Sequence, residues 1–426
     1  MNRVQLIARH VAAGVGAAAA LQSCPTASMS SAAKADDDVV ICCAVRTAVA
    51  KAKRGSFKDT PCEDMLAPLF KEVVKRTKVD PKKVGDVQIG NVLQPGAGAA
   101  TSRMAQMLGD WSYEAPLSAV NRQCSSGLQA VANIAANIKA GIIDIGLGGG
   151  VESMSMYNMA GGMDVNKLSP EIPNNDLAAA CMMPMGITSE NVAAKWNITR
   201  QTQDQLAVDS HKKAVAAQKA KLFDSEIVPV TTTVKDKEGK VTQVTVAADE
   251  GPRADTTLEG LGKLKPAFKP DGTTHAGNAS QVSDGAALVL LARRSTAKAM
   301  GLPIIGRLRS FACVGVDPNV MGIGPAFAIP AALEKAGLKV EDIDIYEINE
   351  AFASQATMSV EHLKIPMEKV NPKGGAIALG HPLGATGARQ IATLLPELKR
   401  TGKKLGVVSM CIGTGMGAAG VIESEQ

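Results

Sequence analysis

Apolar residues along the chain fall in short runs, and amphipathic stretches with lysines on one side separate these runs. A first run, 39–45, follows three aspartates, and later runs cover 117–120 and 147–151. Runs of four to eight apolar residues bounded by turn residues are typical of buried strands. Because such strands alternate with helical segments, the pattern predicts an α/β fold with buried sheets.

The same order of elements occurs twice. Three segments of the first half have counterparts in the second half at an offset of 256–258 positions, and chance rarely repeats such an offset three times in order. In the second half, residues 375–379 are therefore expected to form a strand that leads to His381, as residues 117–120 lead to Cys124 in the first half. The pairs are 84–91 with 340–347, the turn at Cys124 with the turn at His381, and 147–151 with 405–409.

A segment of different character, about 154–282, interrupts the repeat. It contains a basic helix around His211 and two polar strands, 227–234 and 240–247. We interpret this segment as a lobe inserted into the first half. The predicted division is a targeting leader at 1–36, a first half at 37–153 that is completed by about 283–303, an inserted lobe at 154–282, and a second half at 304–426.

Composition and charge exclude several classes of protein. Of the 426 residues, 46% are hydrophobic and 20% are charged, which is ordinary for a globular protein. The formal net charge is only +5 and aromatic residues make up 3%, so neither charge nor a stacking surface favours nucleic acid. No apolar run is long enough to span a membrane. The eight cysteines form no CxxC pair and no Cys/His cluster, so we expect no metal site and reduced, intracellular thiols.

The first 35 residues are rich in Ala and Ser, are basic, and contain no acidic residue before Asp36. This composition is typical of a targeting segment outside the fold, and three kinds of targeting signal have to be compared. A mitochondrial transit peptide fits the composition, whereas a secretory signal would need a stronger apolar core than 11–21. A type-2 peroxisomal signal fits Arg3 and His10, each followed by valine at the required spacing, although the second valine departs from the usual Leu or Ala. The peroxisome is our prediction, with the mitochondrion as runner-up.

Cys124 has the sequence setting of a reactive thiol. It lies between a short apolar strand and an Ala-rich helix that is expected to begin near Ser125. The helix dipole and the unpaired N–H groups of the first turn favour thiolate over thiol. The local sequence leaves a second interpretation open, since free cysteine is among the most buried residue types and can be a plain core residue.

The repeat supplies partners for this thiol. Equivalent turns of a duplicated fold meet at a pseudo-twofold axis, so His381 would face Cys124 as the base that a nucleophilic thiol requires. Taken alone, a histidine in a glycine-rich turn more often binds only backbone. Cys411 is a second thiol, and the glycines after it, including Gly413, suit N–H donors for an oxyanion. Asn349 interrupts an apolar strand-to-helix passage, where a helix cap is the alternative.

Four sequence blocks together resemble the thiolase family, and the resemblance covers nearly everything from about residue 37 to the end. It implies an α/β thiolase fold, with a duplicated five-layer αβαβα core and an inserted loop domain. It also implies an acyltransferase that cleaves 3-ketoacyl-CoA with CoA to acetyl-CoA and a shortened acyl-CoA, as in fatty-acid β-oxidation. The blocks are Asn121-Arg122-Gln123-Cys124-Ser125-Ser126-Gly127, Asn349-Glu350-Ala351-Phe352, Gly380-His381-Pro382-Leu383-Gly384 and Cys411-Ile412-Gly413-Thr414-Gly415-Met416-Gly417.

The resemblance implies a role for each matched residue. The cysteine matched by Cys124 attacks a carbonyl carbon and carries the acyl group as a thioester, in a ping-pong cycle. The histidine matched by His381 accepts the thiol proton and faces the thioester oxygen, where the asparagine matched by Asn349 holds a water. Backbone N–H groups matched by Cys124 and Gly413 form a second oxyanion site. The cysteine matched by Cys411 moves a proton at the alpha carbon of acetyl-CoA, a task that suits a thiol of pKa ~8.5.

By the same resemblance the inserted lobe binds CoA, which is a substrate, and no cofactor is expected. Ser280 matches a serine at the pantetheine, Arg253 a residue beside the adenine, and Met185 the loop of the acyl pocket. Without the resemblance these are ordinary loop and surface positions. Pro184 stands where short-chain biosynthetic members carry histidine, which favours a degradative enzyme. The implied partners are CoA and 3-ketoacyl-CoA, a second copy of the chain in a homodimer, and a peroxisomal import receptor.

Two other hypotheses stay open. A short-chain acetoacetyl-CoA thiolase, mitochondrial in location, would act only on the four-carbon substrate. A non-catalytic acyl-CoA or lipid carrier could use the same fold, but the presence of both cysteines, the histidine and the asparagine argues against it.

Overall fold

The computed structural model describes residues 34–159 and 167–426, and the described chain belongs to one compact unit. The first half builds a sheet in the order β4-β3-β5-β8-β1, in which β3 runs parallel to β4 and β5, and β8 runs antiparallel to β5 and β1. A two-residue strand, β2 (Ala50–Lys51), pairs with β8. The main strands are β1 (Val39–Arg46), β3 (Asp86–Gly90), β4 (Leu117–Val120), β5 (Ile145–Ser153) and β8 (Ser283–Arg293).

The second half repeats this topology in the order β10-β11-β12-β9. Strand β10 runs parallel to β11, and β12 runs antiparallel to both β11 and β9. A parallel bridge from Tyr346 to Val370 stands where the first half has β4. The sheets of the two halves are joined at their edges, where Val40 and Ile41 of β1 pair with β9. The strands are β9 (Gly306–Gly315), β10 (Ile345–Ile348), β11 (Leu405–Ile412) and β12 (Met416–Ser424).

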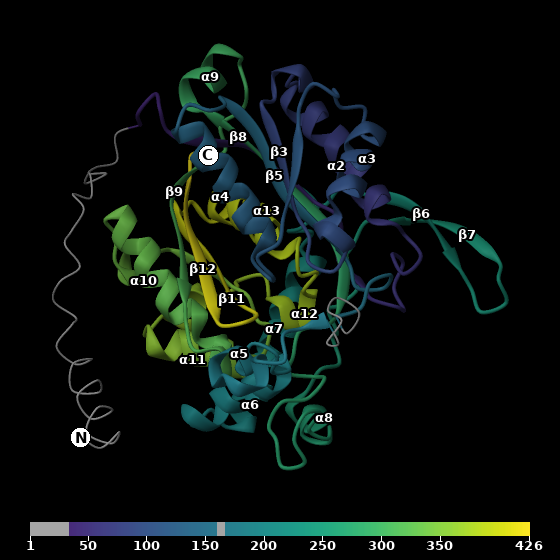
Figure 1. The fold of residues 1–426 in the computed structure, drawn as a ribbon, viewed down its shortest axis with the longest axis vertical. Helices are drawn as coiled ribbons and strands as arrows, with labels where there is room; N and C mark the ends of the chain where they lie inside the picture. Colours follow the sequence, from purple (N-terminus) through teal and green to yellow (C-terminus); the bar gives the residue numbers. More distant parts are fainter. Residues whose placement is uncertain (1–33, 160–166) are drawn as a thin grey trace. The chain divides into compact units, whose positions relative to one another are not determined.

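Helices cover both sheets and fill the space between them (Figure 1). One apolar cluster joins the facing sides of both sheets to two central helices, and separate clusters cover the outer side of each sheet. The layers are therefore helix, sheet, helix, sheet, helix, so the predicted five-layer α/β core is confirmed. The central helices are α4 (Ser126–Lys139) and α13 (Thr386–Thr401); the outer ones are α2 (Cys62–Thr77) with α3 (Ala99–Leu108), and α10 (Gly324–Ala336) with α11 (Ala353–His362).

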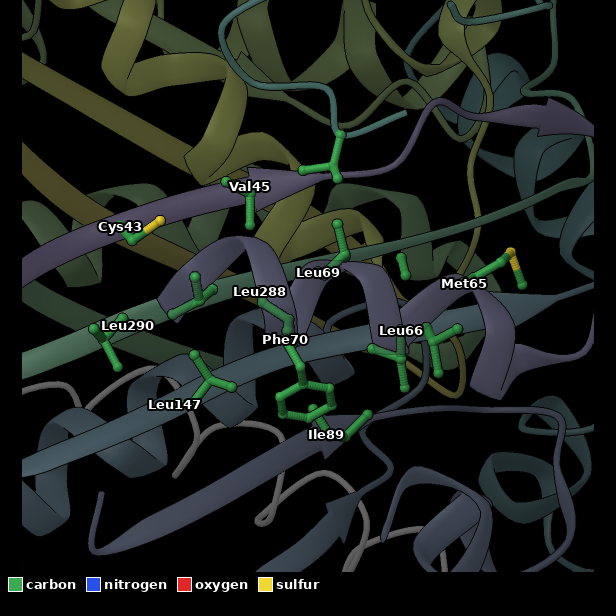
Figure 2. Close-up of a cluster of buried hydrophobic side chains, with 14 of the residues drawn as sticks. Cys43, Val45, Met65, Leu66, Leu69, Phe70, Ile89, Leu147, Leu288 and Leu290 are labelled. Carbon is green, nitrogen blue, oxygen red and sulfur yellow. The ribbon is translucent and has the colours of Figure 1, made fainter. Parts of the chain in front are cut away.

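Helix α2 shows why the outer layers form. Its buried apolar residues recur every three or four positions, as in Leu66, Leu69 and Phe70, and so line one face of a helix. This face packs on Leu147 and Leu288 of the sheet below (Figure 2). Each fully buried side chain of this size contributes about 1.5–3 kcal/mol relative to exposure.

Two expectations about the repeat were wrong in detail. Residues 375–379 do not form a strand, because Ala376–Leu379 is a short helix, α12. The register also differs: α4 begins at Ser126 and α13 at Thr386, 260 positions later. β3 and β10 begin at Asp86 and Ile345, 259 positions apart. Identical residue types at a slightly smaller offset suggested the wrong register, while the duplication itself is confirmed by the topology.

The region predicted as an inserted lobe contains mostly helices and one hairpin. The predicted basic helix is α7 (Arg200–Lys219), and the predicted polar strands are β6 (Val230–Lys235) and β7 (Val241–Val246), which pair antiparallel and extend away from the core (Figure 1). The remaining helices are α5 (Asp176–Ala180), α6 (Met185–Lys195) and α8 (Leu258–Gly262), and α9 (Arg294–Ala299) follows β8. Among the described residues, no helix is long and apolar enough to cross a bilayer.

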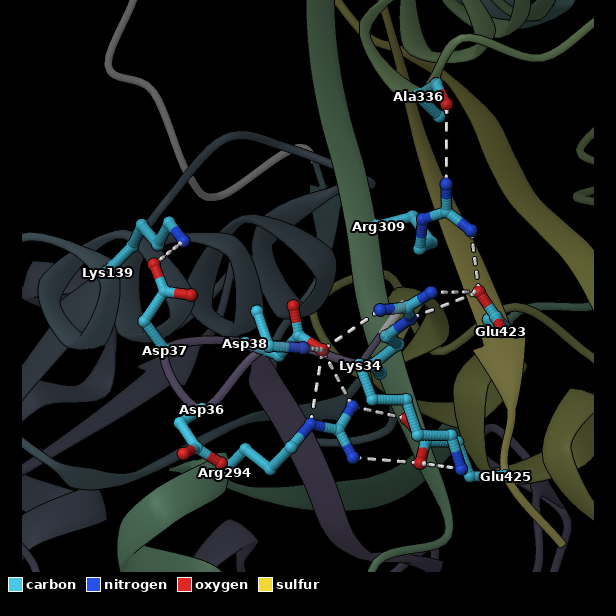
Figure 3. A network of polar contacts seen from close by, with 12 residues as sticks. Lys34, Asp36, Asp37, Asp38, Lys139, Arg294, Arg309, Ala336, Glu423 and Glu425 are labelled. Carbon is cyan, nitrogen blue, oxygen red and sulfur yellow. Dashed lines mark hydrogen bonds and ion pairs between the residues drawn. The ribbon is translucent and has the colours of Figure 1, made fainter. Parts of the chain in front are cut away.

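Ion pairs hold the two ends of the described chain together (Figure 3). Asp38 accepts hydrogen bonds from Arg294 and Arg307, at 2.8 and 2.9 Å. Glu425 binds Arg294 and, at 2.8 Å, Lys34. The last three residues of the predicted leader, 34–36, thus lie within the described chain, whereas Arg3 and His10 lie outside it.

Candidate active site

Cys124 occupies the turn between β4 and α4, where the sequence placed it. The preceding residue, Gln123, has a positive φ of 48°, and the backbone N–H groups of Ser125 and Ser126 bond back to the carbonyls of Arg122 and Gln123. This tight turn places Cys124 directly before the helix, which begins at Ser126. The side chain is only 4% exposed, so the residue is buried and at a helix start at the same time.

Burial dominates the acidity of this thiol. It raises the pKa of Cys124 to about 11, while the backbone N–H groups of Gly413 and of Cys124 itself oppose that rise. Burial thus opposes the thiolate that the helix start was expected to favour, because desolvation penalises the charged form of the thiol. The Gly413 N–H that stabilises negative charge on the sulfur is nevertheless one of the predicted oxyanion donors.

Glycines bring the turns of the two halves into contact. A Cβ on Gly127 would lie 2.6 Å from the carbonyl oxygen of Gly384, and one on Gly150 would lie 1.9 Å from the same oxygen. A side chain at Gly127 would force the first turn of α4, and one at Gly150 would force strand β5, away from the turn that carries His381. Glycine is thus required at this contact between the halves.

His381 is buried and held at both ring nitrogens. Nδ1 lies 2.6 Å from the hydroxyl of Thr386, and Nε2 lies 3.4 Å from Nδ2 of Asn349. Because the Thr386 hydroxyl donates to the carbonyl of Pro382, it accepts from Nδ1–H, which leaves Nε2 unprotonated. Burial, and secondly the charge of Arg389, lowers the pKa of His381 to about 3. The ring is therefore neutral near pH 7, and the Nε2 lone pair, which accepts only a long hydrogen bond from the Asn349 amide, is the atom that can take a proton.

Asn349 follows β10 and does not cap a helix, because Phe352 is the N-cap residue of α11. Its backbone is fixed on both sides: the N–H donates to the carbonyl of Ser409, and its carbonyl accepts from Gln355, at 2.9 and 2.7 Å. The side-chain Oδ1 is buried and has no hydrogen-bond partner among the described residues. A ligand or a water would complete this amide, as the predicted oxyanion role requires.

Cys411 lies at the end of β11 with 1% of its surface exposed. Burial raises the pKa of this thiol, and the charge of Cys124 adds to the effect, so the two sulfurs are close enough for their charges to interact. The turn after it passes through positive φ at Thr414 and Gly415, 68° and 90°. This turn carries Gly413 back towards Cys124.

The three predicted CoA contacts are dispersed. Met185 is the first residue of α6 rather than part of a loop, and it packs against the apolar group that contains Cys411. Ser280 is held near the active site, since its N–H donates to the carbonyl of Ala351 at 2.9 Å. Arg253 is exposed, and its N–H donates to Nδ1 of His211.

The sequence reasoning missed Glu152. This carboxylate is fully buried at the end of β5 and accepts hydrogen bonds from the N–H groups of Val92, Leu93 and Gly384. An acidic residue inside a strand that is otherwise apolar or glycine was a visible signal, since unpaired carboxylates are almost never fully buried. Across residues 34–159 and 167–426, no group of His, Cys, Asp and Glu has the arrangement of a metal site.

These residues define a duplicated α/β protein with a buried thiol–histidine centre, the arrangement of nucleophilic acyl transfer. The chain belongs to the thiolase family: residues 39–295 match the family described as "Thiolase, N-terminal domain", and residues 302–424 match "Thiolase, C-terminal domain".

Individual relatives are similar over almost the whole length. The chain is 58% identical to a rat protein named "3-ketoacyl-CoA thiolase A, peroxisomal", over 99% of this chain and 97% of the relative. It is 56% identical to the human "3-ketoacyl-CoA thiolase, peroxisomal", over 99% of both chains. The crystal structure of the dimeric peroxisomal thiolase of Saccharomyces cerevisiae superposes with a TM-score of 0.85 at 50% identity, covering 92% of this chain and 99% of that one.

Proposed function

We propose that this chain is a 3-ketoacyl-CoA thiolase of fatty-acid β-oxidation, which uses CoA to cleave 3-ketoacyl-CoA into acetyl-CoA and a shortened acyl-CoA. One observation carries the proposal: Cys124 lies beside the N–H of Gly413, on a turn that glycines bring against the turn of a neutral His381. The names of the rat and human relatives supply the substrate class.

In the first half-reaction the proton of Cys124 passes to Nε2 of His381, and the sulfur attacks the 3-keto carbon. Although the pKa of the thiol is about 11, the reaction needs the thiolate only at the moment of attack. Backbone N–H groups of Cys124 and Gly413 stabilise the resulting oxyanion. The bond between the alpha and beta carbons then breaks, which leaves the acyl group on Cys124 as a thioester.

The departing fragment is the enolate of acetyl-CoA, and it needs both an oxyanion site and a proton. His381 and a water held by Asn349 serve the enolate oxygen, while Cys411 delivers the proton to the alpha carbon. The buried, partner-free Oδ1 of Asn349 supports this assignment. After acetyl-CoA leaves, free CoA gives its thiol proton to the Cys411 thiolate and its sulfur attacks the thioester. The bond between Cys124 and the acyl carbon breaks, Cys124 recovers its proton from His381, and the shortened acyl-CoA leaves, so the cycle is ping-pong.

CoA is the substrate that the inserted lobe holds, and the reaction needs no metal or other cofactor. We assign Ser280 to the pantetheine, Arg253 to the adenine end, and Met185 to the wall of the acyl pocket beside Cys411. The division into leader, two halves and inserted lobe is part of the same proposal. The enzyme acts as a homodimer in the peroxisome, as the names of its relatives support, and an import receptor reads the leader.

Mass spectrometry after incubation with a 3-ketoacyl-CoA tests the nucleophile. We expect one acyl group on the peptide of Cys124 and none in Cys124→Ala, whose thiolysis should fall by about 10⁴ or more. Thiolysis measured across chain lengths tests the substrate class. Activity confined to the four-carbon substrate would indicate the short-chain enzyme, and binding of acyl-CoA without any acylation would indicate the carrier.

A further inference from the structure

Glu152 is a buried carboxylate for which the proposed reaction has no use. Its side chain is 0% exposed, and it accepts three backbone N–H groups at 3.0, 3.2 and 3.0 Å, from Val92, Leu93 and Gly384. Hydrogen bonds from N–H groups to a charged acceptor are among the stronger ones in proteins. The carboxylate of Glu152 therefore binds two other segments of its own chain.

The three donors come from both sides of the thiol. Val92 and Leu93 follow β3 of the first half and pack in the apolar group that contains Cys124. Gly384 belongs to the second half, three residues after His381 and two before Thr386, whose hydroxyl binds the imidazole. One carboxylate therefore joins a wall of the Cys124 environment to the turn that carries the histidine.

We propose that Glu152 is a positioning residue, whose carboxylate holds the His381 turn and the Val92–Leu93 segment in register around Cys124. The proposal deepens the proposed function and rests on it for the role of the two partners. Glu152 contacts no reacting atom in this scheme. It acts on catalysis by fixing the distance between nucleophile and base, where a displacement of about 1 Å can reduce the rate about 10²-fold.

The charge of the Glu152 side chain matters for this positioning as well as its length. The ionised carboxylate accepts more strongly from the three donors, because both of its oxygens carry negative charge and neither has an O–H to place among the N–H groups. Burial raises the pKa of Glu152 to about 7, and the three N–H groups oppose that rise. Its negative charge raises the pKa of two neighbouring thiols, Cys124 and Cys62, the latter also affected by Asp284.

Two variants separate charge from reach. Glu152→Gln keeps the size of the side chain but removes its charge, whereas Glu152→Asp keeps the charge but shortens the side chain by one methylene. Glu397→Gln is the matched control, because Glu397 is also a buried carboxylate on α13, and among the described residues its carboxylate binds only the surface residue Arg400. For each variant we would measure kcat and KM for thiolysis and the rate at which iodoacetamide alkylates Cys124, located by peptide mapping.

Both Glu152 variants should lower kcat about tenfold or more, with KM for CoA within about twofold, because positioning acts on the reacting geometry. At pH 8, Glu152→Gln should alkylate about three- to tenfold faster than the wild type, since the repelling charge is gone. Glu152→Asp should alkylate at the wild-type rate. The control should match the wild type in all three measurements.

Unchanged kcat in Glu152→Asp, or kcat losses no greater than in the control, would overturn the proposal. So would equal alkylation rates in the two Glu152 variants, because a merely structural role would not distinguish charge from reach. Should Glu152→Gln fail to fold, kcat of Glu152→Asp decides alone. Alkylation does not depend on thiolysis, so an inactive wild type whose Cys124 still responded to Glu152→Gln would refute the proposed function, and with it the catalytic part of the positioning role, and would leave only the effect of the Glu152 charge on the thiol.

Discussion

Two buried polar clusters of this molecule are built on opposite principles. The first, here the charge cluster, consists of Arg46, Glu226, Asp249 and Lys373, all 0–1% exposed. Arg46 binds Asp249 through two nitrogens and Glu226 through a third, and Glu226 also accepts from Lys373 and Thr393. Each charge in it meets an opposite charge at hydrogen-bond distance.

The second cluster is the candidate active site, and its polar atoms are left incomplete. Oδ1 of Asn349 has no partner among the described residues, Nε2 of His381 has only a contact at 3.4 Å, and both thiols are buried. A buried polar atom without a partner costs about 1–3 kcal/mol. The comparison teaches that the charge cluster has the full pairing of a cluster that stabilises the fold, whereas the active site keeps an unpaired amide oxygen beside its base. Partner-free buried atoms also occur on residues such as Glu347 and Arg389, so this feature marks a reacting site only together with the thiols and the histidine.

The largest effect is expected in the charge cluster and should appear in stability. Arg46→Met removes the cation and leaves the Asp249 carboxylate buried, which should lower the free energy of unfolding by about 3–5 kcal/mol. Urea denaturation followed by tryptophan fluorescence measures this loss. The folded enzyme should keep kcat within about threefold, because positions remote from the reacting groups seldom alter the barrier strongly.

Lys263→Met is the control for this variant, since Lys263 pairs with Glu259 on the surface, where both side chains are mostly exposed. It should leave stability nearly unchanged. If Arg46→Met were as stable as Lys263→Met, full pairing would not be the mark of a stabilising cluster.

A somewhat smaller effect is expected in the active site and should appear in rate. Asn349→Ala removes one oxyanion group, so kcat for thiolysis should fall about 10²–10³-fold with little loss of stability. Asn133→Ala on α4 is the control, because its amide binds Gln88 and Gln129 outside the site. Loss of stability without loss of rate in Asn349→Ala would reverse the contrast between the clusters.

The smallest effect is the pH response of the free thiol. Because the pKa of Cys124 is raised to about 11, its thiolate is a minor form near neutrality. Alkylation should therefore accelerate about tenfold per pH unit from pH 6 to 9.5, except near pH 7, where ionisation of Glu152 adds its repelling charge and lowers the slope. His381, with a pKa of about 3, should add no inflection in that range. Site-resolved mass spectrometry can use exposed Cys181 as an internal reference for reagent access; a plateau near pH 7 would show that the site already stabilises thiolate.

The sequence predicted those features that depend on local pattern. Apolar runs located the strands, the family resemblance indicated the five layers, and the repeat indicated that the turns of Cys124 and His381 lie against each other. The short helix α12 was missed because the apolar run Ala376–Leu379 is compatible with a strand as well as with a helix, and tertiary packing decides between the two. The sequence left the burial of Cys124 open, because the depth of burial is a property of the assembled halves.

Long-range polar contacts were beyond reach for a related reason. Glu152 and Gly384 are 232 positions apart, and Arg46 and Asp249 are 203 positions apart. Nothing in either neighbourhood identifies the other member of such a pair. The family resemblance supplied the candidate catalytic residues, since signature blocks mark the groups that are expected to react, but it did not indicate Glu152.

The middle layer has a consequence for the history of the chain. Helices α4 and α13 share one apolar cluster with the facing sides of both sheets, so each copy of the repeat buries the face that the other leaves open. A chain divided between the two family domains, after residue 295 and before residue 302, would give two fragments that each expose that face to water. Once the copies came to share this layer, neither could be lost or released as an independent protein, and the duplication became irreversible.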